Sequence, residues 1–376
     1  MDKRFASLAA VWVALGVLTV LLPVAPTGAQ QGGQWFVPLA QVSGGAAPSP
    51  TPTTVAPTPT VPPASGAWAP VPNTPAGVAL FAVSSAGGRA FWAVGSGGTV
   101  LRSTDLGATW TSVNAGTSAD LYGVRFIDER TGVIAGVGGT IRRTTDGGAS
   151  WSTPTGGGGN LGFIWFATNQ VGYIGGDGGT ILKTTDGGAS WTRQNSGFDR
   201  DITGIHCISA TNCWASGSSD GGGVVLQTTD GGASWQRVGD NTGFTPLGAV
   251  WFLNGRTGVV GGDPNFATGQ SNIWRTTGGG SSWTRTPTDI FGPAVTGFAF
   301  ITETVGWASA EERIVLQTTD GGASWSTVLQ QLKTPGQNRW LHAIAAAPNG
   351  SAVAVGAVYP ADGSFTPLES IIVRRQ

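Results

Sequence analysis

The sequence repeats one octapeptide, TTDGGASW, which ends at Trp151, Trp191, Trp235 and Trp325. Two looser copies, STDLGATW and TTGGGSSW, end at Trp110 and Trp283, and the segment GAWAPVPN places Trp68 one period upstream. Successive tryptophans in this series are 42, 41, 40, 44, 48 and 42 residues apart. A repeat of this length is typical of propellers and solenoids, so the period constrains the fold more than any other feature.

Each period contains the same short runs of strand-forming residues. In the second period these are LYGVRFI (121–127), then GVIAG, then TIRRTT leading into the octapeptide, and a short segment follows the tryptophan. The runs are rich in β-branched and aromatic residues, are separated by Gly, and have no helical period. Four short antiparallel strands in about 42 residues make one propeller blade.

The two ends of the chain determine the number of blades. After Trp325 the sequence supplies three strand-like runs, the last being SIIVRRQ, and the missing fourth strand is present upstream as ASGAW (64–68). An N-terminal strand that completes the last blade closes the ring and leaves no exposed sheet edge. The sequence therefore predicts an all-β fold, a seven-bladed β-propeller over residues 64–376.

The octapeptide is expected to stabilise the fold rather than to perform chemistry. Its carboxylate can accept hydrogen bonds from the backbone N–H groups that follow, its glycines tolerate positive φ, and its tryptophan can pack between blades. A catalytic or calcium role is not expected, because each hairpin offers one carboxylate and calcium needs six to eight oxygens. The structural aspartates are Asp105, Asp146, Asp186, Asp230 and Asp320.

The first 63 residues are expected to target and space the domain. Residues 1–29 carry Lys3 and Arg4 before an apolar run, which indicates either a cleaved signal peptide or an uncleaved anchor. In both cases we expect export, to an extracellular or cell-surface location. Residues 30–63 are rich in Pro and Thr, and either form a semi-extended stalk or a disordered leader.

Composition argues against most enzyme chemistry. The formal net charge of −1 does not favour nucleic acid, and no metal or cofactor motif is present. Glu311 and Glu312 are expected to form a solvated corner, and His206 and His342 to be polar residues near the central channel. Because export implies an oxidising compartment, Cys207 and Cys213 are expected to form a disulfide.

The octapeptide resembles the S/T-x-D-x-G-x-S/T-W motif, or Asp-box, of bacterial neuraminidase repeat (BNR) propellers. Over residues 78–335, with YIGGDGGTILKTTDGG at 173–188, the chain also resembles the photosystem II stability/assembly factor family. That resemblance implies an exported, non-enzymatic, chaperone-like protein that binds partner polypeptides.

Three functions remain open at this point. The first is a monomeric propeller that binds a protein or a cell-surface polymer and meets the membrane only through its N-terminal segment. The second is a carbohydrate-active enzyme of the sialidase or xyloglucanase type. The third is a stalked structural surface protein.

Two sets of residues are candidates for binding a partner. The residue just before the octapeptide is basic on four consecutive blades, namely Arg375, Arg102, Arg143 and Lys183, with Arg142 and Arg374 beside it. These side chains either form a basic arc suited to carboxylates or tie neighbouring blades together. Long loops at 218–223, 263–271 and 359–369 carry Phe266, Tyr359 and Phe365, which either bind a partner or pack within the loops.

Overall fold

A computed structural model describes residues 66–375, except 220–221, 240–242, 266–269 and 332–333. The chain divides into two units, Met1–Thr60 and Val61–Gln376, and every described residue lies in the second. The targeting segment at 1–29, the linker at 30–63 and the candidate Phe266 lie outside the described residues. Within the described residues, no helix is long and apolar enough to cross a membrane.

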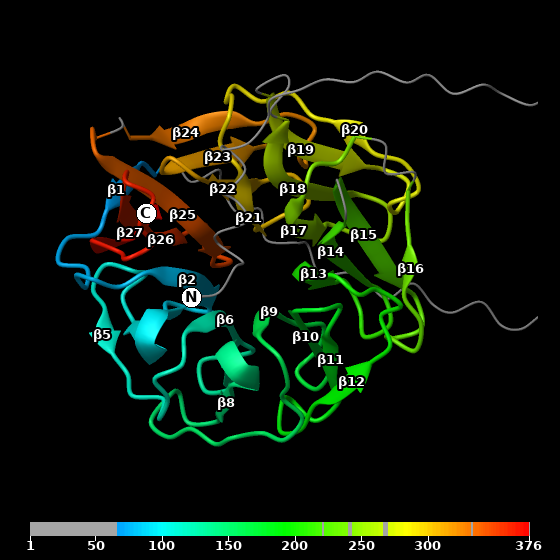
Figure 1. The fold of residues 1–376 in the computed structure, drawn as a ribbon, viewed down its shortest axis with the longest axis horizontal. Coiled ribbons are helices and arrows are strands. Elements are labelled where there is room, and N and C mark those ends of the chain that lie inside the picture. The colour runs from blue at the N-terminus through cyan, green and yellow to red at the C-terminus, as the bar shows by residue number, and fades with distance from the viewer. Residues whose placement is uncertain (1–65, 220–221, 240–242, 266–269, 332–333, 376) are drawn as a thin grey trace, which may run out of the picture. The chain divides into compact units, whose positions relative to one another are not determined.

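Seven antiparallel sheets surround a central axis in the second unit (Figure 1). Blade 1 consists of β2 (Leu80–Ser85), β3 (Phe91–Gly95), β4 (Val100–Ser103) and β5 (Thr111–Ser112). Blade 2 consists of β6 (Leu121–Phe126), β7 (Gly132–Gly136) and β8 (Ile141–Thr144). Blade 3 consists of β9 (Leu161–Phe166), β10 (Gly172–Gly176), β11 (Ile181–Thr184) and β12 (Thr192–Gln194). Blades 4 and 5 consist of β13 (Ile202–Cys207), β14 (Cys213–Ser219), β15 (Gly222–Thr228) and β16 (Gln236–Arg237); and β17 (Leu247–Phe252), β18 (Gly258–Asn265), β19 (Gln270–Thr276) and β20 (Thr284–Arg285). Blade 6 consists of β21 (Val295–Phe300), β22 (Gly306–Ala310), β23 (Ile314–Thr318) and β24 (Ser326–Gln330). Blade 7 consists of β25 (Gln337–Ala346), β26 (Ala352–Pro360), β27 (Glu369–Arg375) and the N-terminal β1 (Trp68–Pro70). In blades 1 and 2, a short 3-10 turn joins the second strand to the third, η1 (Ser96–Gly98) and η2 (Val137–Gly139) respectively.

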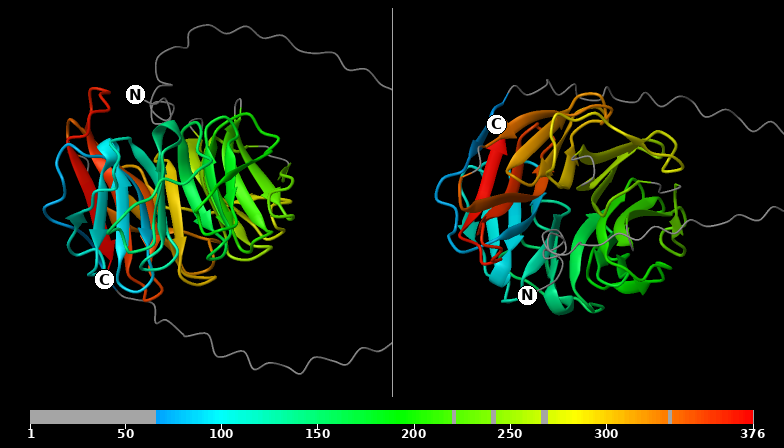
Figure 2. Two further views of the ribbon diagram at one scale, coloured as in Figure 1. Left: turned by 90° about the horizontal axis from the view of Figure 1, so that it is seen from below. Right: turned by 45° about the horizontal axis from the view of Figure 1, so that its top comes forward.

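The N-terminal strand closes the ring as the sequence predicted. β1 pairs antiparallel with β27, with Trp68 opposite Arg375 and Pro70 opposite Val373. The last sheet therefore has the order β1-β27-β26-β25, and both ends of the domain belong to one blade. Figure 2 shows the strands from the side, running between the two faces of the ring. The predicted seven-bladed, all-β fold is confirmed.

Blade 2 departs from the predicted four strands. Its sheet contains β6, β7 and β8, and the expected fourth strand is reduced to one bridge between Arg143 and Ser152. Two residues further along stands Pro154, which has no N–H to continue the ladder. The chain then crosses to the next blade, where Thr155 bridges Ser190.

The hydrophobic core lies between the blades rather than inside one compact centre. Seven of the buried clusters each join two neighbouring blades around the ring. Aromatic stacking ties several of these interfaces, with Trp92 of blade 1 stacked on Phe126 of blade 2 at 4.2 Å between ring centroids. Trp214 of blade 4 stacks on Phe252 of blade 5 at 3.7 Å. Each blade is therefore stabilised mainly by its two neighbours.

Candidate functional site

The octapeptide forms a closed set of hydrogen bonds at each hairpin. In blade 3, Thr184 Oγ1 donates to Asp186 Oδ1 at 2.7 Å and accepts from Gly188 N at 2.9 Å. Ser190 donates to the same carboxylate through its backbone N at 2.9 Å and its Oγ at 2.6 Å. The Asp186 carboxylate therefore bonds to Ser190, four residues further along the chain, whereas the expected Asx-type turn would bond to the residue two positions on. With its oxygens engaged in this way, Asp186 serves the turn.

The same geometry recurs at Asp105, Asp146, Asp230 and Asp320. In the blade 5 copy Gly278 replaces the aspartate, and Thr276 Oγ1 still accepts from Gly280 N at 3.0 Å. The φ of Gly147 is 71° and the φ of Gly148 is 85°, values that favour glycine. In blade 1 the first of these two positions is Leu106, which adopts a φ of 62°.

Hydrogen bonds lower the pKa of these carboxyls. For Asp105 and Asp186, burial raises the pKa, but the bonds from Thr109 and Ser190 outweigh it and bring the pKa to about 2. For Asp146 the bonds from Ser150 are the leading cause and the pKa is also about 2. The carboxylates are therefore ionised acceptors at neutral pH.

Acidification is expected to destabilise the propeller through these turns. Because the folded pKa of about 2 lies below the ordinary 3.8, the ionised carboxylates of Asp105, Asp146 and Asp186 stabilise the fold above pH 3.8. That contribution is lost as the pH falls through about 2. We expect the melting temperature to drop between pH 4 and pH 2, and the triple Asp→Asn variant to show a flatter profile. Identical profiles for the two proteins would contradict this assignment.

The residue before the octapeptide reaches across to the next blade. Arg143 Nε donates to Gly187 O at 2.8 Å, Lys183 Nζ to Gly231 O at 2.6 Å, and Arg275 Nε to Gly321 O at 2.9 Å. In each case the acceptor is the first glycine of the neighbouring octapeptide. Arg102 occupies the same register, with its Cζ 5.3 Å from the Trp92 ring centroid. Arg143, Lys183 and Arg275 therefore tie one blade to the turn of the next, whereas Arg102 contacts Trp92 of its own blade.

The register of blade 7 differs from the sequence alignment by one residue. Arg374 lies opposite Val353, as Arg143 lies opposite Val133 in blade 2. Arg375 instead is buried, donates to Gly350 O at 3.1 Å and lies over the Trp307 ring at 5.0 Å. Arg374, not Arg375, therefore belongs to the basic arc. Sequence alignment missed this because no octapeptide follows β27 to anchor it.

The basic arc is now defined as Arg374, Arg102, Arg142, Arg143 and Lys183. Arg142 points to the other side of β8 and donates to Ile141 O at 3.0 Å and Gly116 O at 3.3 Å. All five side chains are half-buried. The hydrogen bonds above go to main-chain carbonyl oxygens rather than to carboxylates.

Removing one tie should weaken an interface between blades. Arg143→Gln eliminates the hydrogen bond from the guanidinium to Gly187 O. We expect the free energy of unfolding to fall by about 1 kcal/mol, because the lost bond is charge-assisted but partly exposed to solvent. Urea denaturation measures the change. Arg193→Gln, an exposed residue on β12, is the matched control and should change stability by less than about 0.5 kcal/mol. Equal stability of the two variants would mean that Arg143 does not tie the blades.

The long loop of blade 7 packs its aromatic side chains together. Tyr359 is buried, and its ring lies 5.0 Å from Trp340 and 6.4 Å from Phe365. Phe365 is half-buried and lies 6.3 Å from Trp340. Tyr359 lies in β26 and Trp340 in β25, so these contacts are packing of the loop residue Phe365 against the strands of its own blade, and Phe266 lies outside the described residues.

Cys207 and Cys213 end β13 and begin β14, and the structure joins them by a disulfide with Cα atoms 4.0 Å apart. Glu311 is not the solvated charge that the sequence suggested. It is half-buried, and burial raises its pKa to about 7, as burial and Glu311 together do for Asp263 in the adjacent blade. Within the described residues no group of three or more His, Cys, Asp or Glu could hold a metal ion.

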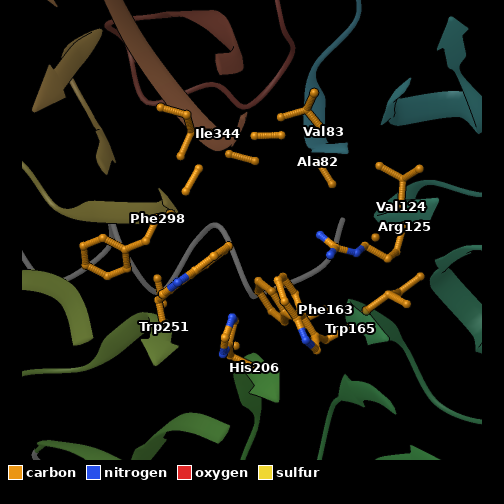
Figure 3. Close-up of a pocket in the computed structure, with 18 of the residues that line it drawn as sticks. Ala82, Val83, Val124, Arg125, Phe163, Trp165, His206, Trp251, Phe298 and Ile344 are labelled. Carbon is orange, nitrogen blue, oxygen red and sulfur yellow. The ribbon is translucent and has the colours of Figure 1, made fainter. Parts of the chain in front are cut away.

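The inner strands surround a cavity of about 460 Å³ at the centre of the ring (Figure 3). His206 and His342 both line it, as expected from sequence, together with Arg125, Trp165 and Trp251. Sequence analysis did not single out these last three residues. Alignment of the first-strand runs would have found them, because they occupy one column of the repeat.

Fold and turn geometry define the class of this protein, a seven-bladed β-propeller whose blades are tied at their hairpin turns. The chain belongs to the family described as Photosynthesis system II assembly factor YCF48, whose model matches residues 158–293 and 262–371, more than half of the sequence. No curated protein matches the sequence.

Solved structures share the fold. YCF48 from Cyanidioschyzon merolae is 18% identical with a TM-score of 0.62, covering 82% of this chain and 98% of that chain. A structure of YCF48 bound to D1 peptide is 19% identical with a TM-score of 0.61, covering 85% and 99%. The GH74 xyloglucanase from Xanthomonas campestris is 14% identical with a TM-score of 0.53, covering 77% and 58%. At these identities the likeness concerns the fold alone.

Proposed function

We propose that this protein is an exported, non-catalytic scaffold that binds an acidic segment of a partner polypeptide along the basic arc. Family membership supports a photosystem II assembly role, and a YCF48 structure contains a bound D1 peptide. The disulfide between Cys207 and Cys213 supports an oxidising, exported location.

The single observation that carries the choice of surface is the nature of the acceptors in the arc. Arg142 and Arg143 bond to carbonyl oxygens, and within the described residues Arg102, Arg142, Arg143 and Lys183 have no ion pair with a carboxylate. A carbonyl oxygen fixes the position of a side chain without neutralising its charge. The charges of these four side chains therefore remain available to carboxylate groups of a partner, which arginine suits.

The octapeptide geometry supports the non-catalytic part of the proposal. The five octapeptide aspartates each serve their own turn, on different blades. They consequently do not converge on one substrate.

Binding of a fluorescein-labelled, Glu-rich 15-residue peptide to the full chain tests the proposal. We expect fluorescence anisotropy to show binding that weakens as salt rises, because exposed charges are screened. The double variant Arg102→Gln/Arg142→Gln should weaken binding about tenfold, and Arg256→Gln, an exposed arginine in blade 5, should not. Equal binding by the two variants would contradict the surface, and release of reducing ends from xyloglucan would contradict the non-catalytic role.

A further inference from the structure

Four consecutive inner strands carry large side chains at the same register position. On each strand the residue in question lies opposite the second residue of the neighbouring strand of its blade. The four residues, on blades 2 to 5 in order, are Arg125, Trp165, His206 and Trp251, here termed the channel row.

The members of the channel row contact one another in sequence around the channel. Arg125 Cζ lies 3.9 Å from the centroid of the Trp165 ring. The His206 ring lies 4.1 Å from Trp165 and 4.4 Å from Trp251. Figure 3 shows these side chains gathered on one side of the cavity. The row is a continuous stack that begins with a guanidinium, in which Trp165 lies between Arg125 and His206, and His206 lies between the two indoles.

On the remaining three blades the same register position holds small residues. Ala299 lies opposite Trp307, Ala345 opposite Val353, and Ser84 opposite Trp92. Because these side chains are small and those of the channel row across the ring are large, space remains at the centre. Ala299 and Ala345 line the resulting cavity of about 460 Å³. That volume is in the range of pockets that hold small molecules.

Among the described residues that line this cavity, Arg125 is the charged one and none is a carboxylate. Among the residues that the structure describes, its guanidinium contacts the face of Trp165 and makes no hydrogen bond or ion pair. Burial lowers its pKa to about 10, so it remains a cation at neutral pH. Arg125 is half-buried, so its guanidinium faces the cavity as a cation that no carboxylate of the described lining neutralises, and an anionic ligand would pair with it.

His206, on the far side of Trp165 from Arg125, adds a neutral donor to the lining. Its Nδ1 accepts from Phe252 N at 3.3 Å, which assigns the proton to Nε2. Burial, and then the charge of Arg125, hold the pKa of His206 well below 6.5. The imidazole therefore stays neutral at physiological pH and does not repel a cationic neighbour.

We propose that the channel row binds a small, planar anion, with a carboxylate on Arg125 and an apolar ring against Trp165 and Trp251. Guanidinium is suited to bidentate capture of a carboxylate, and the aromatic lining that Trp165 and Trp251 give the cavity suits a flat apolar body. This site is separate from the basic arc, so it stands or falls independently of the proposed polypeptide partner.

Titration of the full chain with 2-naphthoate, followed by ligand-observed NMR and calorimetry, tests the site. The uncharged isostere 2-naphthalenemethanol should bind about tenfold or more weakly, because it lacks the charge-assisted bond. Arg125→Met should reduce naphthoate affinity by a similar factor and leave binding of the alcohol unchanged. Arg237→Met, which removes an exposed arginine 5.5 Å from the Phe198 ring, is the matched control and should bind naphthoate as the parent does.

Equal affinity for the acid and the alcohol, or no naphthoate binding at millimolar concentration, would overturn the proposal. Both outcomes are read on the parent chain, so the test does not depend on whether Arg125→Met folds. A second variant, Ala345→Phe, fills the cavity from the opposite side and should abolish binding of both probes. Retained naphthoate binding in that variant would place the anion elsewhere and also overturn the proposal.

Discussion

Replacing Trp191 by alanine is expected to lower the free energy of unfolding by about 3 to 5 kcal/mol. Trp191 is 3% exposed and packs between blades 2 and 3, in one cluster with Val133 and Ile141. Its ring meets Phe166 edge-on at 5.9 Å. Truncation therefore leaves a large cavity at the interface of blades 2 and 3, and urea denaturation measures the loss in the free energy of unfolding.

The matched control is Phe291→Ala. Phe291 is an exposed aromatic residue at 72%, so its truncation should change stability by less than about 0.5 kcal/mol. Equal losses in the two variants would show that the tryptophan is not an interblade peg. Trp191→Phe should lie between them, because part of the packing is retained.

Deleting residues 66–71, which include β1, is expected to destabilise the propeller by about 4 kcal/mol or more. Trp68 is 8% exposed and packs with Trp307 and Val315 of blade 6. The deletion also removes the ladder partner of β27 and leaves an open sheet edge, so aggregation should increase. Thermal unfolding followed by light scattering measures both effects.

A deletion of equal length in the Pro/Thr-rich segment, residues 56–61, provides the control for shortening the chain. It should leave the melting temperature within about two degrees of the parent, because it removes no residue of the described blades. Equal melting temperatures for the two deletion variants would show that closure by β1 does not stabilise the ring.

Blade number, strand order and ring closure could all be predicted from the repeat. Side chains along a strand alternate between its two faces, and tight turns with positive φ favour glycine. Short segments such as LYGVRFI and TTDGGASW therefore indicate the strands and turns of each blade by themselves. The tryptophan spacing located Trp68 as the closing residue, and β1 confirms it. Two histidines were also placed beside the channel because both fall in first-strand runs.

Other features were decided by packing between segments far apart in the sequence. The pairing of β26 with β27 places Arg374, rather than Arg375, in the position that Arg143 occupies in blade 2. The sequence did not reveal this register because no octapeptide follows β27. Glu311 differs from its expected solvated state because it is half-buried and Ala294 N, 17 residues earlier in the chain, donates to its carboxylate. The channel row forms because Arg125, Trp165 and His206 lie about 40 residues apart in sequence but on adjacent inner strands. Local pattern determines which residues form a blade, whereas contacts between blades determine which side chains meet, and those contacts exist once the ring has closed.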